Sequence, residues 1–152
     1  MMSAVSYLGN QSLLSLPKTA FLASNTIPLE MVLRCYDWAV MMRDAGHCVV
    51  SGFSSRLERD VWDFLVSGTQ PIILVLARGM YQRVPPPLES LLTSGRLLVI
   101  STTMSPRQSR ATAFARNKYI CELADEILFI GANEGSSLHP LQVAYSQKAI
   151  AW

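Results

Sequence analysis

Short apolar runs alternate with longer amphipathic segments along most of this chain. The apolar runs are typical of strands that are buried on both faces of a parallel sheet. They predict strands at residues 19–23, 47–51, 72–77, 97–100 and 126–130, with the start of a last strand at 149–152. Between these runs, hydrophobic residues recur at helical spacing. That spacing predicts helices from Pro28 to Gly46, from Ser55 to Gly68, and at about 88–93, 111–124 and 138–146.

This regular alternation predicts an α/β fold, a Rossmann-like three-layer sandwich with a mostly parallel sheet. The sequence leaves the order of the strands open. We expect residues 1–18 to form an N-terminal extension that packs on the domain, and residues 19–152 to form the domain itself. One helix start carries a clear local signal, because Ser55 and Glu58 have the spacing of a capping box.

Composition limits the classes of function. Half of the residues are hydrophobic and 16% are charged, which excludes a disordered chain. No apolar stretch has the length of a membrane span and no basic, apolar leader opens the chain, so we expect a cytoplasmic protein without membrane contact. The cysteines and histidines form no ligand cluster, so we expect buried thiols, no metal site and no cofactor. These residues are Cys35, Cys48, Cys121, His47 and His139.

Polar turns follow several of the predicted strands. The turn after the second strand reads Ser51-Gly52-Phe53-Ser54-Ser55, and the turn after the fifth contains Gly135-Ser136-Ser137. In a parallel sheet such turns share one edge, where helix N-termini present backbone N–H groups to an anion. We therefore predict a phosphate-binding site at this edge, although any single serine could instead act only as a helix cap.

Basic residues gather in one part of the chain, although the formal net charge is only +2. Residues 96–121 contain five of them and no acidic residue: Arg96, Arg107, Arg110, Arg116 and Lys118. Such a cluster can bind phosphates or can form an ordinary solvated face. Arg116 and Lys118 lie about 200° apart around a helix, so they cannot both face one pocket.

Other motifs give little support for an enzyme. The chain has no G-x-G-x-x-G turn, no phosphate-binding P-loop and no G-x-S-x-G elbow. Among the aromatic residues, Tyr81 and Phe114 lie in or next to loops, where they could contact a ligand ring or a base. Trp38, Trp62 and Tyr36 recur on apolar helix faces, so we expect them in the core.

Several segments together resemble the DNA-processing protein A family (DprA, also called Smf). That family is a Rossmann-like branch of the superfamily that includes the lysine-decarboxylase-like phosphoribohydrolases. The matching motifs run in order through nearly the whole chain: Gly9-Asn10-x-x-Leu13-Leu14, Pro17-Lys18, Val49-Val50-Ser51-Gly52, Arg116-Asn117-Lys118-x-Ile120-x-x-Leu123 and Ser137-Leu138. The resemblance implies the same fold and a role in DNA uptake or recombination, through binding of single-stranded DNA and loading of a recombinase.

The sequence departs from the family pattern at several places. Ala23-Ser24-Asn25 stands where the family has Gly-Ser-Arg after its first strand, so that arginine is absent. The family's Ser-Gly-x-Ala-Arg-Gly becomes Ser51-Gly52-Phe53-Ser54-Ser55-Arg56, with the arginine displaced by one position. The phosphoribohydrolase branch would show a P-G-G-x-G-T loop and a catalytic glutamate, whereas Glu134 reads as a loop charge. We also expect no winged-helix domain, which many members of the family carry.

We therefore predict a non-catalytic protein that binds single-stranded DNA or other nucleic-acid phosphates and that could form a homodimer. Two alternatives stay open: binding or hydrolysis of a small nucleotide derivative in the same crevice, and a domain kept for protein–protein interaction. Serines and backbone amides would hold the phosphates while cations neutralise them. The predicted site residues are Ser24, Asn25, Ser51, Gly52, Ser54, Ser55, Arg56, Arg110, Arg116, Asn117, Lys118, Gly135, Ser136 and Ser137.

Overall fold

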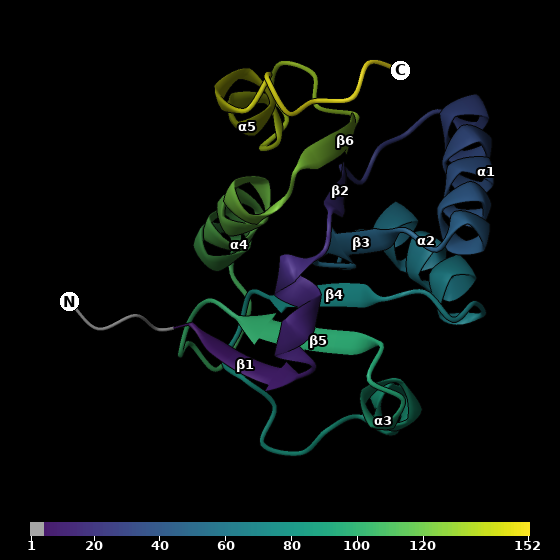
Figure 1. Cartoon of the computed structure of the whole chain (residues 1–152). Helices are drawn as coiled ribbons and strands as arrows, with labels where there is room; N and C mark the ends of the chain where they lie inside the picture. Colours follow the sequence, from purple (N-terminus) through teal and green to yellow (C-terminus); the bar gives the residue numbers. More distant parts are fainter. Residues whose placement is uncertain (1–4) are drawn as a thin grey trace.

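A six-stranded sheet separates two layers of helices in the computed structural model, which describes residues 5–152 (Figure 1). Five strands are parallel, and β1 pairs antiparallel with β5 at one edge. Their order across the sheet is β1 (Ser6–Gly9), β5 (Leu97–Ser101), β4 (Ile72–Leu76), β3 (Cys48–Ser51), β2 (Lys18–Ala23) and β6 (Glu126–Ile130). The predicted Rossmann-like sandwich with a mostly parallel sheet is confirmed.

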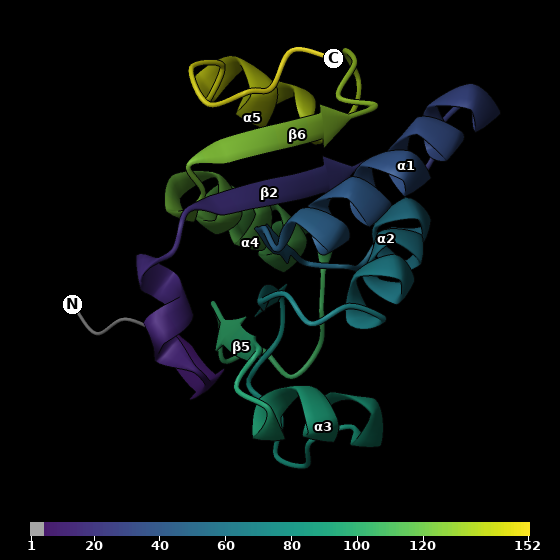
Figure 2. The ribbon, with the colours of Figure 1, turned by 45° about the vertical axis from the view of Figure 1, so that its right-hand side comes forward.

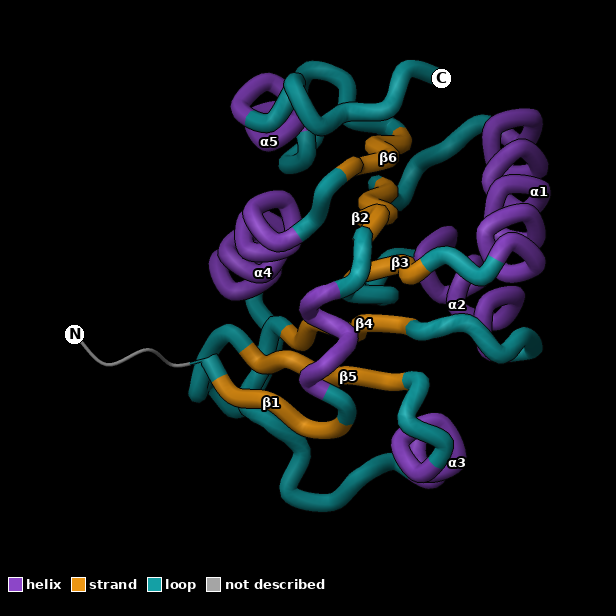
Figure 3. The backbone as a smooth tube through the Cα atoms, in the orientation of Figure 1, coloured by secondary structure: helices purple, strands orange, loops and turns teal. Residues whose placement is uncertain are grey.

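The helices cover both faces of the sheet (Figure 3). One face packs against α1 (Leu29–Ala45), α2 (Arg56–Val66) and α3 (Pro86–Thr93). The other packs against α4 (Arg110–Leu123), α5 (His139–Ala144) and a 3₁₀ turn, η1 (Gln11–Ser15). The strands are therefore buried from both sides, which explains why their sequences read as nearly uninterrupted apolar runs.

Two hydrophobic cores result from this arrangement. Along β2, Phe21 points into the core under α1 and α2, while Leu22 points into the core under α4. Phe21 stacks on Trp38, with ring centroids 5.2 Å apart, so the predicted core position of Trp38 is confirmed. Trp62 and Tyr36 are half-buried and pack against the same core.

Two segments differ from the prediction. Residues 5–18 are more than an extension packed on the domain, because β1 completes the sheet along β5; residues 1–4 of that predicted extension lie outside the described part. The strand predicted at 149–152 is wrong. Only Ala149 forms a bridge, to Ile127, and Trp152 instead lies against Arg34 with the guanidinium 4.2 Å from the ring centroid.

The order of the strands creates a crevice. From β2 to β5 the chain moves in one direction across the sheet, and α4 then carries it back over the other face to β6, on the far side of β2. Figure 2 shows β2 and β6 side by side, with α1 following β2 and α5 following β6. Because the chain leaves these two strands toward opposite faces, a crevice opens at their carboxyl ends. Within residues 5–152, no helix is long and apolar enough to cross a membrane.

Candidate functional site

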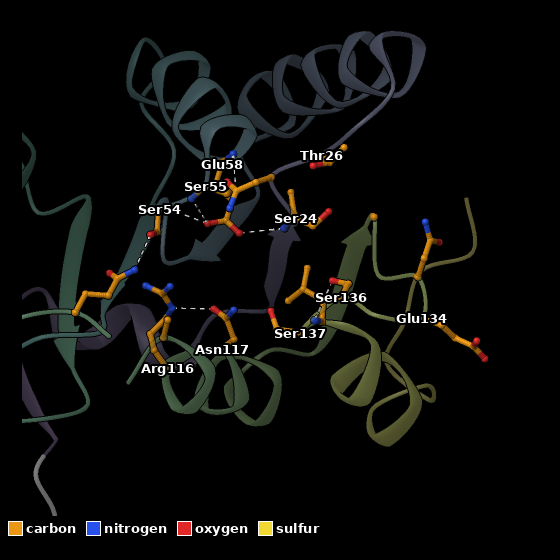
Figure 4. Close-up of a pocket in the computed structure, with 17 residues that line it drawn as sticks. Ser24, Thr26, Ser54, Ser55, Glu58, Arg116, Asn117, Glu134, Ser136 and Ser137 are labelled. Carbon is orange, nitrogen blue, oxygen red and sulfur yellow. Dashed lines mark hydrogen bonds between the residues drawn. The ribbon is translucent and has the colours of Figure 1, made fainter. Parts of the chain in front are cut away.

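The crevice is a cleft of about 590 Å³ at the carboxyl ends of β2, β3 and β6 (Figure 4). It brings together turns that are far apart in the sequence, so the prediction that they open on one edge of the sheet is confirmed. From the predicted set, the residues that line it are Ser24, Asn25, Ser54, Ser55, Arg116, Asn117, Ser136 and Ser137.

The turns after β2 and β6 are in direct contact at the centre of the cleft. The backbone N–H of Ser24 donates to the carbonyl of Ile130 at 3.0 Å. Gly131 has a φ of +71°, and a Cβ at this position would overlap the Ser24 side chain. Only glycine satisfies both the left-handed backbone and the close approach.

Glu58 binds several of the backbone N–H groups that the sequence predicts to bind an anion. Its buried carboxylate accepts hydrogen bonds from the backbone N–H of Ala23 at 3.0 Å, of Ser54 at 2.9 Å and of Ser55 at 3.2 Å. The capping box between Ser55 and Glu58 is confirmed. The bond to Ala23 could not be predicted because it joins residues 35 positions apart. In this part of the cleft an internal carboxylate therefore stands where a phosphate would otherwise meet the backbone.

Arg116 forms the floor of the cleft. Only 3% of its surface is exposed, and its guanidinium donates to the Val75 carbonyl at 3.2 Å and to Asn117 Oδ1 at 2.8 Å. Burial lowers the pKa of Arg116 below its ordinary value, while the nearby charge of Glu58 opposes that shift. The innermost charges of the cleft are therefore one arginine and one glutamate that balance each other.

Gly52 makes room for this guanidinium. A Cβ on Gly52 would overlap the guanidinium of Arg116. The preceding residue, Ser51, is buried, and its hydroxyl accepts from the backbone N–H of Phe53 at 3.1 Å. Ser51 and Gly52, both predicted as site residues, therefore shape the turn beneath the cleft. Neither of them lines the cleft.

The remaining predicted residues divide into two groups. At the rim, Ser54 Oγ accepts from Gln108 at 3.0 Å and Ser136 Oγ accepts from the backbone N–H of Leu138 at 3.1 Å. Ser137 and Asn133 also line the cleft, and within residues 5–152 their backbone N–H groups make no hydrogen bond. Four predicted residues are exposed and do not line it: Arg56, Arg110, Lys118 and Gly135.

Exposed arginines also stand on the edge of the sheet that holds the cleft. Arg56 and Arg110 are the first residues of α2 and α4, which follow β3 and β5. Arg78 and Arg83 follow β4, and Arg107 follows β5. The described residues contain two ion pairs, and neither involves these five side chains. Prediction of the site missed Arg78 and Arg83, because the loop after β4 lacks the serine and glycine turn found after the other strands.

No group of three or more histidine, cysteine, aspartate or glutamate side chains in the described part of the chain is placed to hold a metal ion.

Comparison with known proteins gives a consistent result. The family model of DNA recombination-mediator protein A matches residues 2–152. DNA processing protein A from Helicobacter pylori, described for its single-stranded DNA binding mode, has 17% identity and a TM-score of 0.72 over 97% of this chain and 72% of that one. DNA processing protein A from Streptococcus pneumoniae has 18% identity and a TM-score of 0.75 over 97% of this chain, which spans 55% of that protein.

A third structure shares the fold more distantly. The molybdenum cofactor binding protein from Rippkaea orientalis has 12% identity and a TM-score of 0.58, over 88% of this chain and 73% of that one. No curated protein sequence matches the chain.

Proposed function

The chain belongs to the DNA recombination-mediator protein A family, and from this premise we propose that it binds single-stranded DNA along the carboxyl edge of its sheet. One observation carries the proposal: five exposed arginines, which form no ion pair within residues 5–152, stand on the same edge as a cleft lined with serines and amides. Guanidinium groups bind phosphates well because their planar donors match the phosphate oxygens.

The binding would be non-catalytic and independent of base sequence. Arginines at the rim would neutralise phosphates, while the unbonded N–H groups of Asn133 and Ser137 and the hydroxyl of Ser24 would orient them. If all five arginines contact phosphates, the logarithm of the binding constant should fall with the logarithm of salt concentration at a slope of about −3.5.

Fluorescence anisotropy with a labelled oligothymidylate between 50 and 200 mM salt tests this proposal. The Arg56→Ala/Arg110→Ala double variant should weaken binding and reduce the slope by about 1.4. Arg34→Ala is the matched control, since Arg34 is an exposed arginine of α1 whose guanidinium lies over the Trp152 ring. Absence of binding by the unaltered protein at low salt, or an equal loss in the control, would contradict the proposal.

Arg116 is buried and Lys118 is exposed, so variants of these two residues test different things. Removal of Arg116 would leave the Val75 carbonyl without its partner, so a loss of binding in Arg116→Ala would report on folding as well as on DNA. Lys118 is exposed and lies outside the cleft, so Lys118→Ala measures whether the outer side of α4 contributes to binding.

Family membership disfavours the alternative, a small nucleotide derivative in the same cleft. Competition separates the two functions: an oligonucleotide should displace the labelled probe, whereas thymidine monophosphate at equal phosphate concentration should not. A mononucleotide that competes as well as the oligonucleotide would favour the nucleotide-binding alternative over the binding of DNA.

We also propose a cytoplasmic location, a recombinase partner and self-association of the chain. The family resemblance suggests the recombinase, and the exposed apolar side chains of Leu29, Leu33 and Met41 on α1 offer a surface for a second copy of the chain. Light scattering of the chain and of Leu33→Glu tests the dimer. Recruitment of a purified recombinase to the oligonucleotide complex tests the other partner.

A further inference from the structure

A second cleft, of about 890 Å³, lies at the carboxyl ends of β4 and β5. Its walls are Val5 and Ser6 at the start of β1 and the loops at residues 78–85 and 103–106. Hydrogen bonds tie these two loops and the end of β5 together. The N–H of Gly79 donates to the Ser105 carbonyl at 2.7 Å, and Ser101 Oγ donates to the Arg78 carbonyl at 2.6 Å. The two loops are therefore held together before any ligand arrives.

The chemistry of this cleft differs from that of the first. It is lined by Arg78 and Arg83, by the half-buried ring of Tyr81 and by Met104, whose surface is 85% exposed. No acidic residue of the described chain lines it, whereas the first cleft contains Glu58 and Glu134. An anion that approaches this edge thus meets uncompensated positive charge at the second cleft.

The ring of Tyr81 lines this cleft and also packs partly against the core on the α1–α3 face of the sheet. The Arg78 guanidinium carbon lies 5.7 Å from the ring centroid, within the range of a cation–π contact. Aromatic rings next to arginines are the usual platform for single-stranded nucleic acids, because every base has a face that can stack. Phosphates alone would not require the aromatic ring or the exposed thioether of Met104.

From these observations we infer that the second cleft is a further binding site for single-stranded nucleic acid, in which a base stacks on Tyr81 while Arg78 and Arg83 neutralise the adjacent phosphates. The inference rests on the proposed function and extends it to a second subsite on the same edge. The first cleft spans β3, β2 and β6, and the second spans β4 and β5, so one strand of DNA can cross both.

The separation of the two sites sets a length requirement. Their centres are about 2.5 strand spacings apart, or about 12 Å. At about 3.4 Å for each stacked nucleotide, that gap corresponds to about three or four nucleotides. Four stacked residues span three such steps, about 10 Å, and fall short of joining the two centres, whereas twelve residues should reach both.

Anisotropy with twelve-residue and four-residue oligothymidylates provides the test. Tyr81→Leu should weaken binding of the twelve-residue probe by about 5-fold or more, whereas Tyr81→Phe, which keeps the ring, should bind as the unaltered protein does. Arg83→Ala should reduce the salt slope by about 0.7. Tyr145→Leu is the control, because Tyr145 lies near the bridge at the amino end of β6, on the opposite edge of the sheet.

Photocrosslinking gives a readout that does not depend on a variant's stability. A twelve-residue probe containing 5-iodouracil should crosslink to the peptide that carries Tyr81, as mapped by mass spectrometry. If the unaltered protein binds no probe, the proposed function itself fails. If it binds, but Tyr81→Leu and Arg83→Ala leave affinity and slope unchanged and the crosslink maps elsewhere, the second site is overturned while the proposed function stands.

Discussion

Replacement of Gly52 by alanine tests how the floor of the first cleft is built. The φ of Gly52 lies outside the left-handed region, so the backbone itself accepts an L-residue. The added Cβ would, however, overlap the guanidinium of Arg116, which is buried and bonded to the Val75 carbonyl and Asn117. The overlap is so close that we expect the guanidinium to be displaced.

The cost follows from the contacts that such a movement breaks. A hydrogen bond to a charged group contributes about 1.5–3 kcal/mol, and the Val75 carbonyl would lose its charged donor. We therefore expect Gly52→Ala to lower the free energy of unfolding by about 2–3 kcal/mol. For a chain of this length, that loss lowers the melting temperature by about 4–12 °C.

A double-mutant cycle with Arg116→Ala separates this cause from others. Without the guanidinium, the three atoms that the Cβ would overlap most closely are gone, so Gly52→Ala should cost less than about 0.5 kcal/mol in the Arg116→Ala background. Urea unfolding of the four proteins gives the coupling energy. Gly79→Ala is the matched control, because its Cβ would have its nearest atom at 3.5 Å and its φ also lies outside the left-handed region. An equal cost of Gly52→Ala in both backgrounds would refute the reasoning.

Three further predictions concern the cap, the edge strand and the thiols. Ser55→Ala should lower the free energy of unfolding by about 1 kcal/mol, measured by urea unfolding, because the capping box of α2 loses one half. Gly9→Ala should cost more than about 2 kcal/mol by the same measurement, since φ is +103° and a Cβ would overlap the Leu97 carbonyl. Burial raises the pKa of three thiols from 9.0 to about 12, so these thiols ionise at a lower pH in the unfolded chain than in the folded one. The free energy of unfolding should therefore fall as the pH rises from 9 toward 12. By pH 10 each thiol should cost about 1 kcal/mol. Cys48→Ala should reduce this alkaline loss by about a third in urea unfolding at pH 8 to 10; the thiols are Cys35, Cys48 and Cys121.

Sequence patterns predicted the parallel strands well because both faces of those strands are buried. The bounds of β6 were predicted to the residue, and β3 and β4 to within one residue at one end. β1 was missed because its four residues are mostly exposed and too few to show a pattern. The strand at 149–152 failed because a short apolar ending does not reveal whether a sheet edge is available beside it.

The site was predicted less completely, because its central contacts join distant parts of the chain. The serine turns were identified from local signals, and the structure brings them together. The bond from Ala23 to Glu58 depends on the packing of α2 against the end of β2, which no local pattern encodes. The loop that carries Arg78 and Arg83 has no serine and glycine turn to mark it. Only the strand order shows that these two arginines lie on the same edge of the sheet as the serine turns.

The displaced family arginine explains where the positive charge of this chain lies. In the family pattern that the sequence resembles, an arginine stands at the position of Ser55, which here is the N-cap of α2, whereas Arg56 is the first residue of that helix. Arg56 is accordingly exposed and does not line the first cleft, and Asn25 replaces the other family arginine there. The first cleft retains hydrogen-bond donors and a balanced pair, Arg116 and Glu58. We therefore expect the electrostatic attraction of a DNA strand to depend mainly on the exposed arginines elsewhere on this edge of the sheet, above all on those in the loops after β4 and β5.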